Sequence, residues 1–309
     1  MKNFINLKDI PARDLRKILW DAKKRKKKRI KLSTLDIDKD QPLKGKLLVQ
    51  MYEKQSSRTR LSFHIAINQL GAGSITLKAS EMHLGKGGES LADTAKILST
   101  YADGFLLRTD RDKKIDEFCK NLNIPIINLL SPSSHPCQVL SDIFTVEEIK
   151  KKSISKLNIC WIGDCNNVLN SLIAAAVKFN FNLNIGCPKN YVPPKFVMDW
   201  VKKNKGRVNI FNNPKKAAKN ADVVFSDKVV SLNDKVNITK KIRDFKEFRI
   251  DNNLMKVTKP QSIFLHCLPR GNEVSEEVFF GKHSKVWQQA SNRIHVQKSI
   301  LCYVFGQLR

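Results

Sequence analysis

The chain has 309 residues and a formal net charge of +27 at pH 7, with 41% hydrophobic and 28% charged residues. This length exceeds that of a usual single hydrophobic core, so we expect a globular protein of two domains. No apolar stretch approaches the roughly 20 residues of a membrane span, and the N-terminus lacks the apolar core of a secretion signal.

A basic run is the first distinctive segment along the chain. Residues 23–29 read Lys-Lys-Arg-Lys-Lys-Lys-Arg, and such runs can bind polyanions. Lysine is nevertheless spread along the whole chain, as at 150–152 and 202–203, and no recognised nucleic-acid motif accompanies the run. We therefore interpret it as part of a lysine-rich surface that concentrates small anions, and expect no specific nucleic-acid partner.

Short apolar segments alternate with amphipathic ones along the rest of the chain. Helical spacing of apolar residues is clear in segments such as 61–70, 90–101 and 168–180. The predicted strands are 46–52, 74–77, 104–107, 126–130, 157–162, 182–187, 208–211, 222–226 and 262–267. Strands interleaved with helices indicate parallel sheets covered on both faces. The predicted fold is therefore α/β, with two doubly wound parallel-sheet domains and an active-site cleft between them.

The domain boundary is expected just after the fourth strand. The first domain is predicted to span residues 1–134 together with a C-terminal helix, 290–309, that returns to it. The second is predicted to span residues 135–289 and to begin with an interdomain helix, 135–150. Each domain then holds four or five strands, a usual number for one sheet.

The cysteines indicate a reducing compartment. There are seven of them, an odd number, and most lie inside apolar runs. Neither a Cys-x-x-Cys pair nor zinc-ligand spacing is present. We predict reduced thiols, no metal site and a cytoplasmic location.

Polar residues follow the predicted strands at their carboxyl ends, where ligands bind in open α/β sheets. Residues 56–60 follow the first strand, and Arg108 closes the third. The other positions are His135 and Gln138 after the fourth strand, 163–167 after the fifth, Asp227 after the eighth and 266–271 at the end of the last.

The segment 56–60 is the sharpest of these signals. It reads Ser-Ser-Arg-Thr-Arg between a predicted strand and a predicted helix. The start of a helix offers free backbone N–H groups and the positive end of the helix dipole. Arginine adds a bidentate grip on phosphate oxygens. The segment therefore predicts a phosphate site, although Ser and Thr are also ordinary helix caps.

Three segments together carry a family resemblance: residues 56–60, His135-Pro136-Cys137-Gln138 and the segment 266–270, which reads His-Cys-Leu-Pro-Arg. In this order and spacing they resemble the transcarbamoylases, and specifically the branch that acts on ornithine. The likeness covers nearly the whole chain.

This resemblance implies transfer of the carbamoyl group of carbamoyl phosphate to the δ-amine of L-ornithine, giving L-citrulline and phosphate in arginine metabolism. It also implies that no cofactor is used, that both substrates are small molecules, and that the protein is a homotrimer or a multiple of trimers.

The resemblance also implies roles for individual residues. Those that match the carbamoyl phosphate site are Ser56, Ser57, Arg58, Thr59, Arg108, His135, Gln138 and Arg293, with His83 supplied by the neighbouring subunit. Those that match the ornithine site are Asn167, Asp227, Ser231, Leu232, Cys267 and Leu268. The implied catalytic residues are Arg108 and His135, which would stabilise the developing oxyanion, and Cys267, which would orient the amine.

Two departures from the family pattern leave alternatives open. Residues 231–233 read Ser-Leu-Asn where the family has Ser-Met-Gly, which removes the conformational freedom of a glycine. Residues 84–90 form a loop one residue longer than the family's. The alternatives are a transferase acting on acylornithine or putrescine, and a non-catalytic homologue that binds polyanions. An aspartate-specific enzyme is disfavoured, because its relatives have proline at the position of Cys267.

Overall fold

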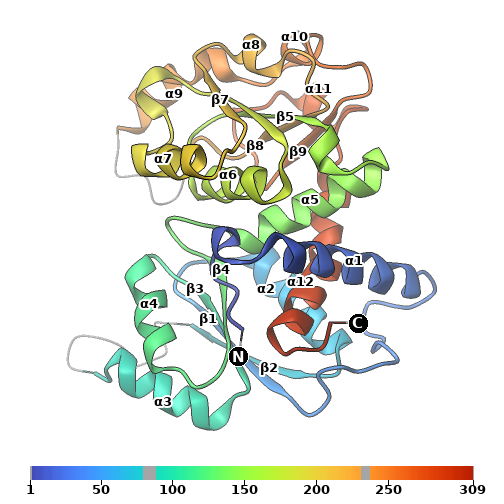
Figure 1. The fold of residues 1–309 in the computed structure, drawn as a ribbon, viewed down its shortest axis with the longest axis vertical. Coiled ribbons are helices and arrows are strands. Elements are labelled where there is room, and N and C mark those ends of the chain that lie inside the picture. The colour runs from blue at the N-terminus through green and yellow to red at the C-terminus, as the bar shows by residue number, and fades with distance from the viewer. Residues whose placement is uncertain (1, 79–87, 231–236, 309) are drawn as a thin grey trace. The chain divides into compact units, whose positions relative to one another are not determined.

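The computed structural model describes residues 2–78, 88–230 and 237–308. The chain divides into two compact units (Figure 1), Met1–Ser141 with Asn292–Arg309, and Asp142–Ser291. Both boundaries fall within helices, α5 (Pro136–Lys150) and α12 (Val286–Val304). The domains predicted from sequence end a few residues earlier, at 134 and 289, because the pattern marks where a helix begins and not where its contacts change.

Unit 1 contains a four-stranded parallel sheet in the order β2-β1-β3-β4. The strands are β1 (Leu47–Tyr52), β2 (Gly73–Lys78), β3 (Gly104–Arg108) and β4 (Ile126–Leu130). The helices besides α12 and the start of α5 are α1 (Ala12–Lys28), α2 (Ser57–Gln69), α3 (Leu91–Tyr101) and α4 (Asp112–Asn121).

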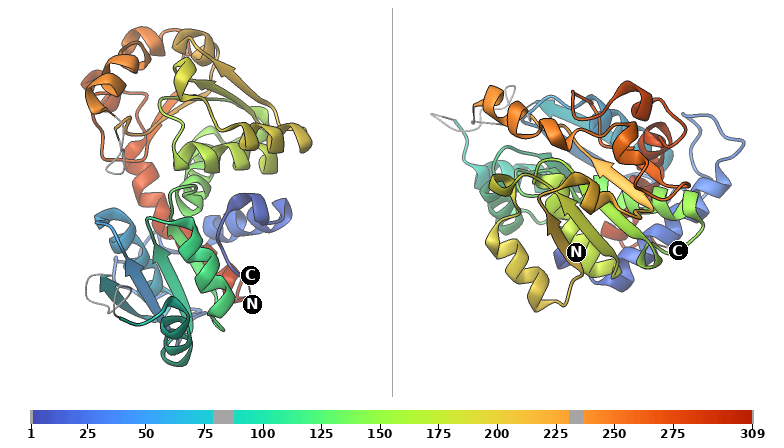
Figure 2. Two further views of the ribbon diagram at one scale, coloured as in Figure 1. Left: turned by 90° about the vertical axis from the view of Figure 1, so that its left-hand side faces the viewer. Right: turned by 90° about the horizontal axis from the view of Figure 1, so that it is seen from above.

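Helices cover both faces of this sheet (Figures 1 and 2). Helices α3 and α4 lie on one face, where Ala95, Leu98 and Phe118 pack against Val49 and Phe105. Helices α1, α2 and α12 lie on the other face. Strands β1 and β3 are almost fully buried, as expected for parallel strands covered on both sides. Lys2 lies over the ring of Tyr303, which places both ends of the chain in this unit.

Unit 2 contains a five-stranded parallel sheet in the order β7-β6-β5-β8-β9. The strands are β5 (Asn158–Ile162), β6 (Asn182–Gly186), β7 (Val208–Phe211), β8 (Val223–Ser226) and β9 (Ile263–His266). The helices besides α5 and α12 are α6 (Asn167–Phe179), α7 (Lys195–Lys203), α8 (Pro214–Ala218), α9 (Ile238–Asp244), α10 (Asn252–Met255) and α11 (Glu276–Phe279).

The order of these strands explains how the helices are distributed. The chain moves from β5 out to β7 and then returns to β8 and β9 on the other side. Right-handed crossovers then place α6 and α7 on one face and α8, α10 and α11 on the other (Figure 1). Cys160, Val224 and Phe264 of the sheet pack against Ala217 and Phe279 on this second face.

These arrangements confirm the predicted α/β class with two parallel sheets, and each predicted strand lies within one residue of its observed bounds. None of the helices in the described residues is long and apolar enough to cross a bilayer. The basic run differs from the prediction of a lysine-rich surface. Arg25 and Arg29 are only 4% and 8% exposed, because both point into a buried network of carboxylates.

Candidate active-site clusters in the two units

The N-terminus of α2 forms the base of the polar cluster in unit 1. Ser56 has extended backbone dihedrals, φ −157° and ψ 92°, and α2 begins at the next residue, Ser57. Arg58 is exposed, whereas Thr59 is 2% exposed. Because the amides of a first helical turn have no intrahelical partner, this turn presents donors to an anion.

Arg108 reaches this turn from the end of β3. It lies opposite Tyr52 in the parallel register of β1 and β3, and its Nη1 donates to Ser56 Oγ at 3.1 Å. Its Nε is buried and has no hydrogen-bond partner in the described part of the chain. Burial, together with Arg293 and Arg58, lowers the pKa of Arg108 to about 10, although Tyr52 opposes the shift. The guanidinium is therefore charged at neutral pH and lies in a strongly positive setting.

Arg293 approaches the same helix from α12. Its Nη2 donates to Thr59 Oγ1 at 2.8 Å, and its Nη1 donates to Gln138 Oε1 at 2.8 Å. The side chains of Thr59, Gln138 and Arg293 are all at least 96% buried. One guanidinium thus joins three helices, α2, α5 and α12, and fixes the amide of Gln138 with its oxygen toward Arg293.

His135 immediately precedes α5 and is buried. Burial lowers the pKa of its imidazole well below 6.5, and Arg293, Arg108 and Arg58 lower it further in that order. The imidazole is therefore neutral at pH 7 and can donate only one hydrogen bond through a ring N–H. The structure brings His135 into the field of three arginines that the sequence assigned to the same site.

The cluster in unit 1 thus combines three guanidiniums with a neutral hydrogen-bond donor, a set of groups that suits a small anion. Arg108, which closes β3, donates to Ser56, Arg293 donates to Thr59 in the first turn of α2, and Arg58 lies in the same turn. Repulsion among the three cations is relieved when a dianion such as phosphate binds.

The corresponding cluster in unit 2 begins at the turn between β5 and α6. Gly163 has φ +140°, a conformation that L side chains rarely adopt, and it allows the chain to turn sharply after β5. Asn166 then caps α6, its Oδ1 accepting from Val168 N at 3.0 Å and Leu169 N at 3.2 Å. Asn167 is the first residue of the helix and is partly exposed.

Asp227 directly follows β8, the strand adjacent to β5. Its Oδ2 accepts a hydrogen bond from Asn166 Nδ2 at 2.8 Å. Burial raises the pKa of the Asp227 carboxyl, although His266 and Asn166 oppose the shift. A carboxylate with a raised pKa is a favourable partner for an ammonium group, because ion pairing restores the solvation that burial removes.

A series of hydrogen bonds begins at His266, the last residue of β9. His266 Nδ1 accepts from Leu268 N at 2.9 Å, so its Nε2 carries the hydrogen and donates to Glu273 Oε1 at 3.0 Å. The same oxygen accepts from Gly271 N at 2.5 Å. Burial raises the pKa of Glu273, but these hydrogen bonds outweigh it and lower the pKa overall.

These hydrogen bonds fix the backbone at Cys267 and Leu268, two of the residues predicted to bind ornithine. Leu268 has φ +58°, the left-handed region, which costs a non-glycine residue roughly 1–3 kcal/mol. The bond from its amide to His266 holds it in that conformation. Cys267 lies between them and is partly exposed.

Two residues of this cluster had no role assigned from the sequence. Asn166 lies in the predicted strand-end segment 163–167, beside the assigned Asn167, and it donates to Asp227. Glu273 lies seven residues after His266 in a loop with no periodic pattern, so the sequence carried no signal for it. Three predicted residues, His83, Ser231 and Leu232, lie outside the described residues.

Comparison with known proteins places the chain in a family. The carbamoyl-phosphate-binding domain of the aspartate/ornithine carbamoyltransferases matches residues 2–148, and the aspartate/ornithine-binding domain of the same enzymes matches residues 155–304. The chain belongs to the aspartate/ornithine carbamoyltransferase family.

Individual relatives are similar in sequence to this chain over nearly their whole length. The ornithine carbamoyltransferase of Brucella suis is 40% identical over 305 residues, covering 98% of this chain and 95% of that protein. The ornithine carbamoyltransferase of Ruthia magnifica is 40% identical over 310 residues, and the match covers 99% of this chain and 100% of that protein. Among solved structures, the ornithine carbamoyltransferase of Pyrococcus furiosus has a TM-score of 0.92 and 34% sequence identity, and the match covers 100% of this chain and 98% of that one. The anabolic ornithine carbamoyltransferase of Campylobacter jejuni has a TM-score of 0.90 and 33% identity, and the match covers 99% of this chain and 100% of that one.

Proposed function

We propose that this enzyme transfers the carbamoyl group of carbamoyl phosphate to the δ-amine of L-ornithine, giving L-citrulline and phosphate. One observation carries the proposal. Arg108, which donates to Ser56, and Arg293, which donates to Thr59 and Gln138, both lower the pKa of the buried His135 and keep its imidazole neutral at pH 7.

Unit 1 supplies the groups that the carbamoyl donor needs. The first turn of α2 and the exposed Arg58 suit the phosphate oxygens. Arg108 is assigned to bridge the phosphate and the carbonyl oxygen, and the neutral His135 is assigned to donate to that oxygen. Gln138 suits the carbamoyl amide. When the amine attacks the carbonyl carbon, negative charge grows on the carbonyl oxygen and then on the departing phosphate. Donors fixed before the reaction stabilise that charge without reorganising.

Unit 2 supplies the groups that suit the acceptor. Asn167 at the start of α6 suits the α-carboxylate of ornithine, and the carboxyl of Asp227 suits its α-ammonium group. Cys267 and the carbonyl of Leu268 are assigned to the reacting δ-amine. The hydrogen bonds from Glu273 to His266 and from His266 to the Leu268 amide hold these two residues in place.

The reaction requires a neutral amine. A free primary alkylamine keeps its proton up to a pKa of about 10.4, so only a minority is neutral at pH 7. The δ-nitrogen loses one proton before attack and a second after the carbon–nitrogen bond forms, and the carbon–oxygen bond to phosphate breaks. Turnover is therefore expected to rise with pH through neutrality.

A colorimetric citrulline assay tests this assignment. Purified protein is mixed with carbamoyl phosphate and, in separate reactions, with ornithine, acetylornithine, putrescine or aspartate. Product with ornithine at the highest kcat/KM is the expected result. A higher kcat/KM with acetylornithine or putrescine would reassign the acceptor, and no product with any amine would contradict a carbamoyl transferase.

We further propose a cytoplasmic enzyme of arginine biosynthesis that works as a closed trimer, in which His83 of one subunit completes the carbamoyl phosphate site of the next. The family resemblance supports this assembly. Light scattering of the active protein at several concentrations tests it, since a fully active monomer of about 35 kDa would contradict the shared site.

A further inference from the structure

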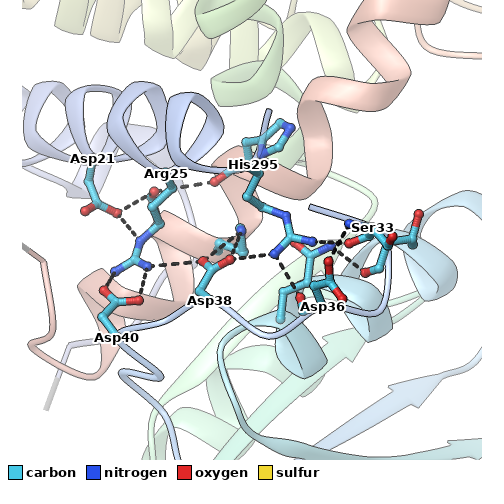
Figure 3. A network of polar contacts seen from close by, with 12 residues as sticks. Asp21, Arg25, Ser33, Asp36, Asp38, Asp40 and His295 are labelled. Atoms are coloured by element: carbon cyan, nitrogen blue, oxygen red, sulfur yellow. Dashed lines mark hydrogen bonds and ion pairs between the residues drawn. The ribbon is translucent and has the colours of Figure 1, made fainter. Parts of the chain in front are cut away.

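The basic run of α1 has an inward-facing part that the proposed reaction does not explain. Arg25 points into a network with Asp21, Asp38 and Asp40 (Figure 3), and Arg29 contacts Asp38 in the same network. Arg25 Nε donates to Asp21 Oδ2 at 2.8 Å, and its Nη2 lies 3.2 Å from Asp40 Oδ2. Arg29 Nη1 donates to Asp38 Oδ1 at 2.7 Å.

Asp38 is the centre of this network. Both of its oxygens accept from Lys298 Nζ on α12, at 3.0 and 2.9 Å, in addition to the bond from Arg29. Lys298 is completely buried and Asp38 is 8% exposed. Three carboxylates, of which Asp21 and Asp38 are buried and Asp40 is partly exposed, therefore face three buried cations within unit 1. An ammonium group without solvent is stable only where such partners surround it.

Two further bonds tie α12 to α1. Ser299 Oγ donates to Asp21 Oδ2 at 2.6 Å, and Lys26 Nζ donates to Asn292 Oδ1 at 2.7 Å. Asn292 is the residue before Arg293, whose guanidinium binds Thr59 and Gln138. The helix is thus fixed on both sides of Arg293 along its axis, at Asn292 and at Lys298.

We propose that this network positions Arg293 for carbamoyl phosphate, and that Lys26, Asp38 and Lys298 are positioning residues of the reaction. The inference rests on the proposed function. A helix turns 100° per residue and rises 1.5 Å, so a small slide or rotation of α12 changes where the guanidinium of Arg293 lies. A forked donor must match phosphate oxygens in both distance and angle, which makes it sensitive to such a shift.

The decisive comparison is a split between the two Michaelis constants. Lys298→Met keeps most of the side-chain volume and removes the charge, so Asp38 loses its contact on α12. The KM for carbamoyl phosphate is expected to rise roughly tenfold or more, since a displacement of about 1 Å can cost up to a hundredfold. The KM for ornithine is expected to stay within about twofold, because its assigned residues lie in unit 2.

Matched variants separate positioning from loss of stability. Lys298→Arg keeps the charge and is expected to recover part of the carbamoyl phosphate affinity. Lys259→Met removes a cationic partner of Asp222 in unit 2, at 2.8 and 2.9 Å, and is expected to leave the carbamoyl phosphate KM unchanged. If Lys298→Met does not fold, Lys26→Met carries the same test, because Asn292 is its partner beside Arg293.

Calorimetric titration with carbamoyl phosphate provides a readout independent of turnover. The inference is supported if wild-type protein binds carbamoyl phosphate and the Lys298 or Lys26 variant binds it more weakly. This holds even if wild-type protein forms no citrulline, because the absence of citrulline would refute only the proposed function. Variants that lose active protein but keep wild-type KM and wild-type binding would overturn the inference, since the network would then serve stability alone.

Discussion

Replacement of Glu273 tests how the loop after β9 is held. The carboxylate accepts two hydrogen bonds on one oxygen, from His266 Nε2 at 3.0 Å and from Gly271 N at 2.5 Å, and its side chain is nearly buried. Glu273→Gln keeps an acceptor oxygen in the same place and removes the negative charge. Glu273→Ala removes the acceptor and leaves two donors without a partner.

The magnitudes follow from these two bonds. Hydrogen bonds to a charged group contribute about 1.5–3 kcal/mol each and neutral ones about 0.5–1.5, so Glu273→Gln is expected to cost roughly 2 kcal/mol of unfolding free energy. Glu273→Ala leaves the buried donor of His266 unsatisfied, at about 1–3 kcal/mol, and removes a bond to the partly exposed Gly271 amide of about 1.5–3 kcal/mol, so it is expected to cost roughly 2–6 kcal/mol. Both variants loosen His266, which holds Leu268 at φ +58°.

Urea unfolding and steady-state kinetics measure the two effects. We expect the KM for ornithine to rise in both variants, more for Ala than for Gln, with the KM for carbamoyl phosphate nearly unchanged. Gly271→Ala is a useful companion, because its Cβ would lie 2.8 Å from Glu273 Oε2 and disturb the same contact. Unfolding free energies and ornithine KM values equal to wild type in Glu273→Ala would refute the proposed support of the loop.

Three other predictions address separate parts of the molecule. Arg58→Ala should abolish saturation by carbamoyl phosphate without loss of stability, because Arg58 is exposed, and saturation at wild-type affinity would contradict its assignment. Asp227→Asn should raise the ornithine KM steeply yet increase the melting temperature near pH 7, because burial raises the pKa of Asp227 and so makes its ionised form costly in the folded state. A variant with wild-type ornithine kinetics would remove Asp227 from the site. The third prediction concerns Lys298. Burial lowers the pKa of its ammonium group from 10.5 to about 8; Asp38 opposes this shift, and Arg29 and Arg25 add to it. Between pH 8 and 10.5 the unfolded chain therefore binds more protons than the folded one, so the unfolding free energy of wild type should rise with pH. Relative to Lys298→Met, the gain through this window should reach about 3 kcal/mol. A difference between the two proteins in urea unfolding that stays constant with pH would contradict the prediction.

The sequence by itself determined the features that depend on neighbours along the chain. Alternation of apolar strands with amphipathic helices predicts parallel sheets, because only crossover helices join such strands. Parallel strands in turn place every carboxyl end on one edge, which is why Arg108, His135 and Asp227 could be assigned to strand ends in advance. The segment 56–60 could be interpreted for a similar reason, since the start of a helix is a local feature.

Only the tertiary structure decided which of these side chains meet. Asn166 and Asp227 are 61 residues apart, and Lys298 and Asp38 are 260 apart. Periodicity shows which face of a helix or strand is buried but not what packs against it. Arg25 and Arg29 continue the helical spacing of the buried Leu15, Ile18 and Ala22, but only packing showed which carboxylates they meet. A buried charge needs a partner, and the partner of the buried Lys298 comes from a distant part of the chain.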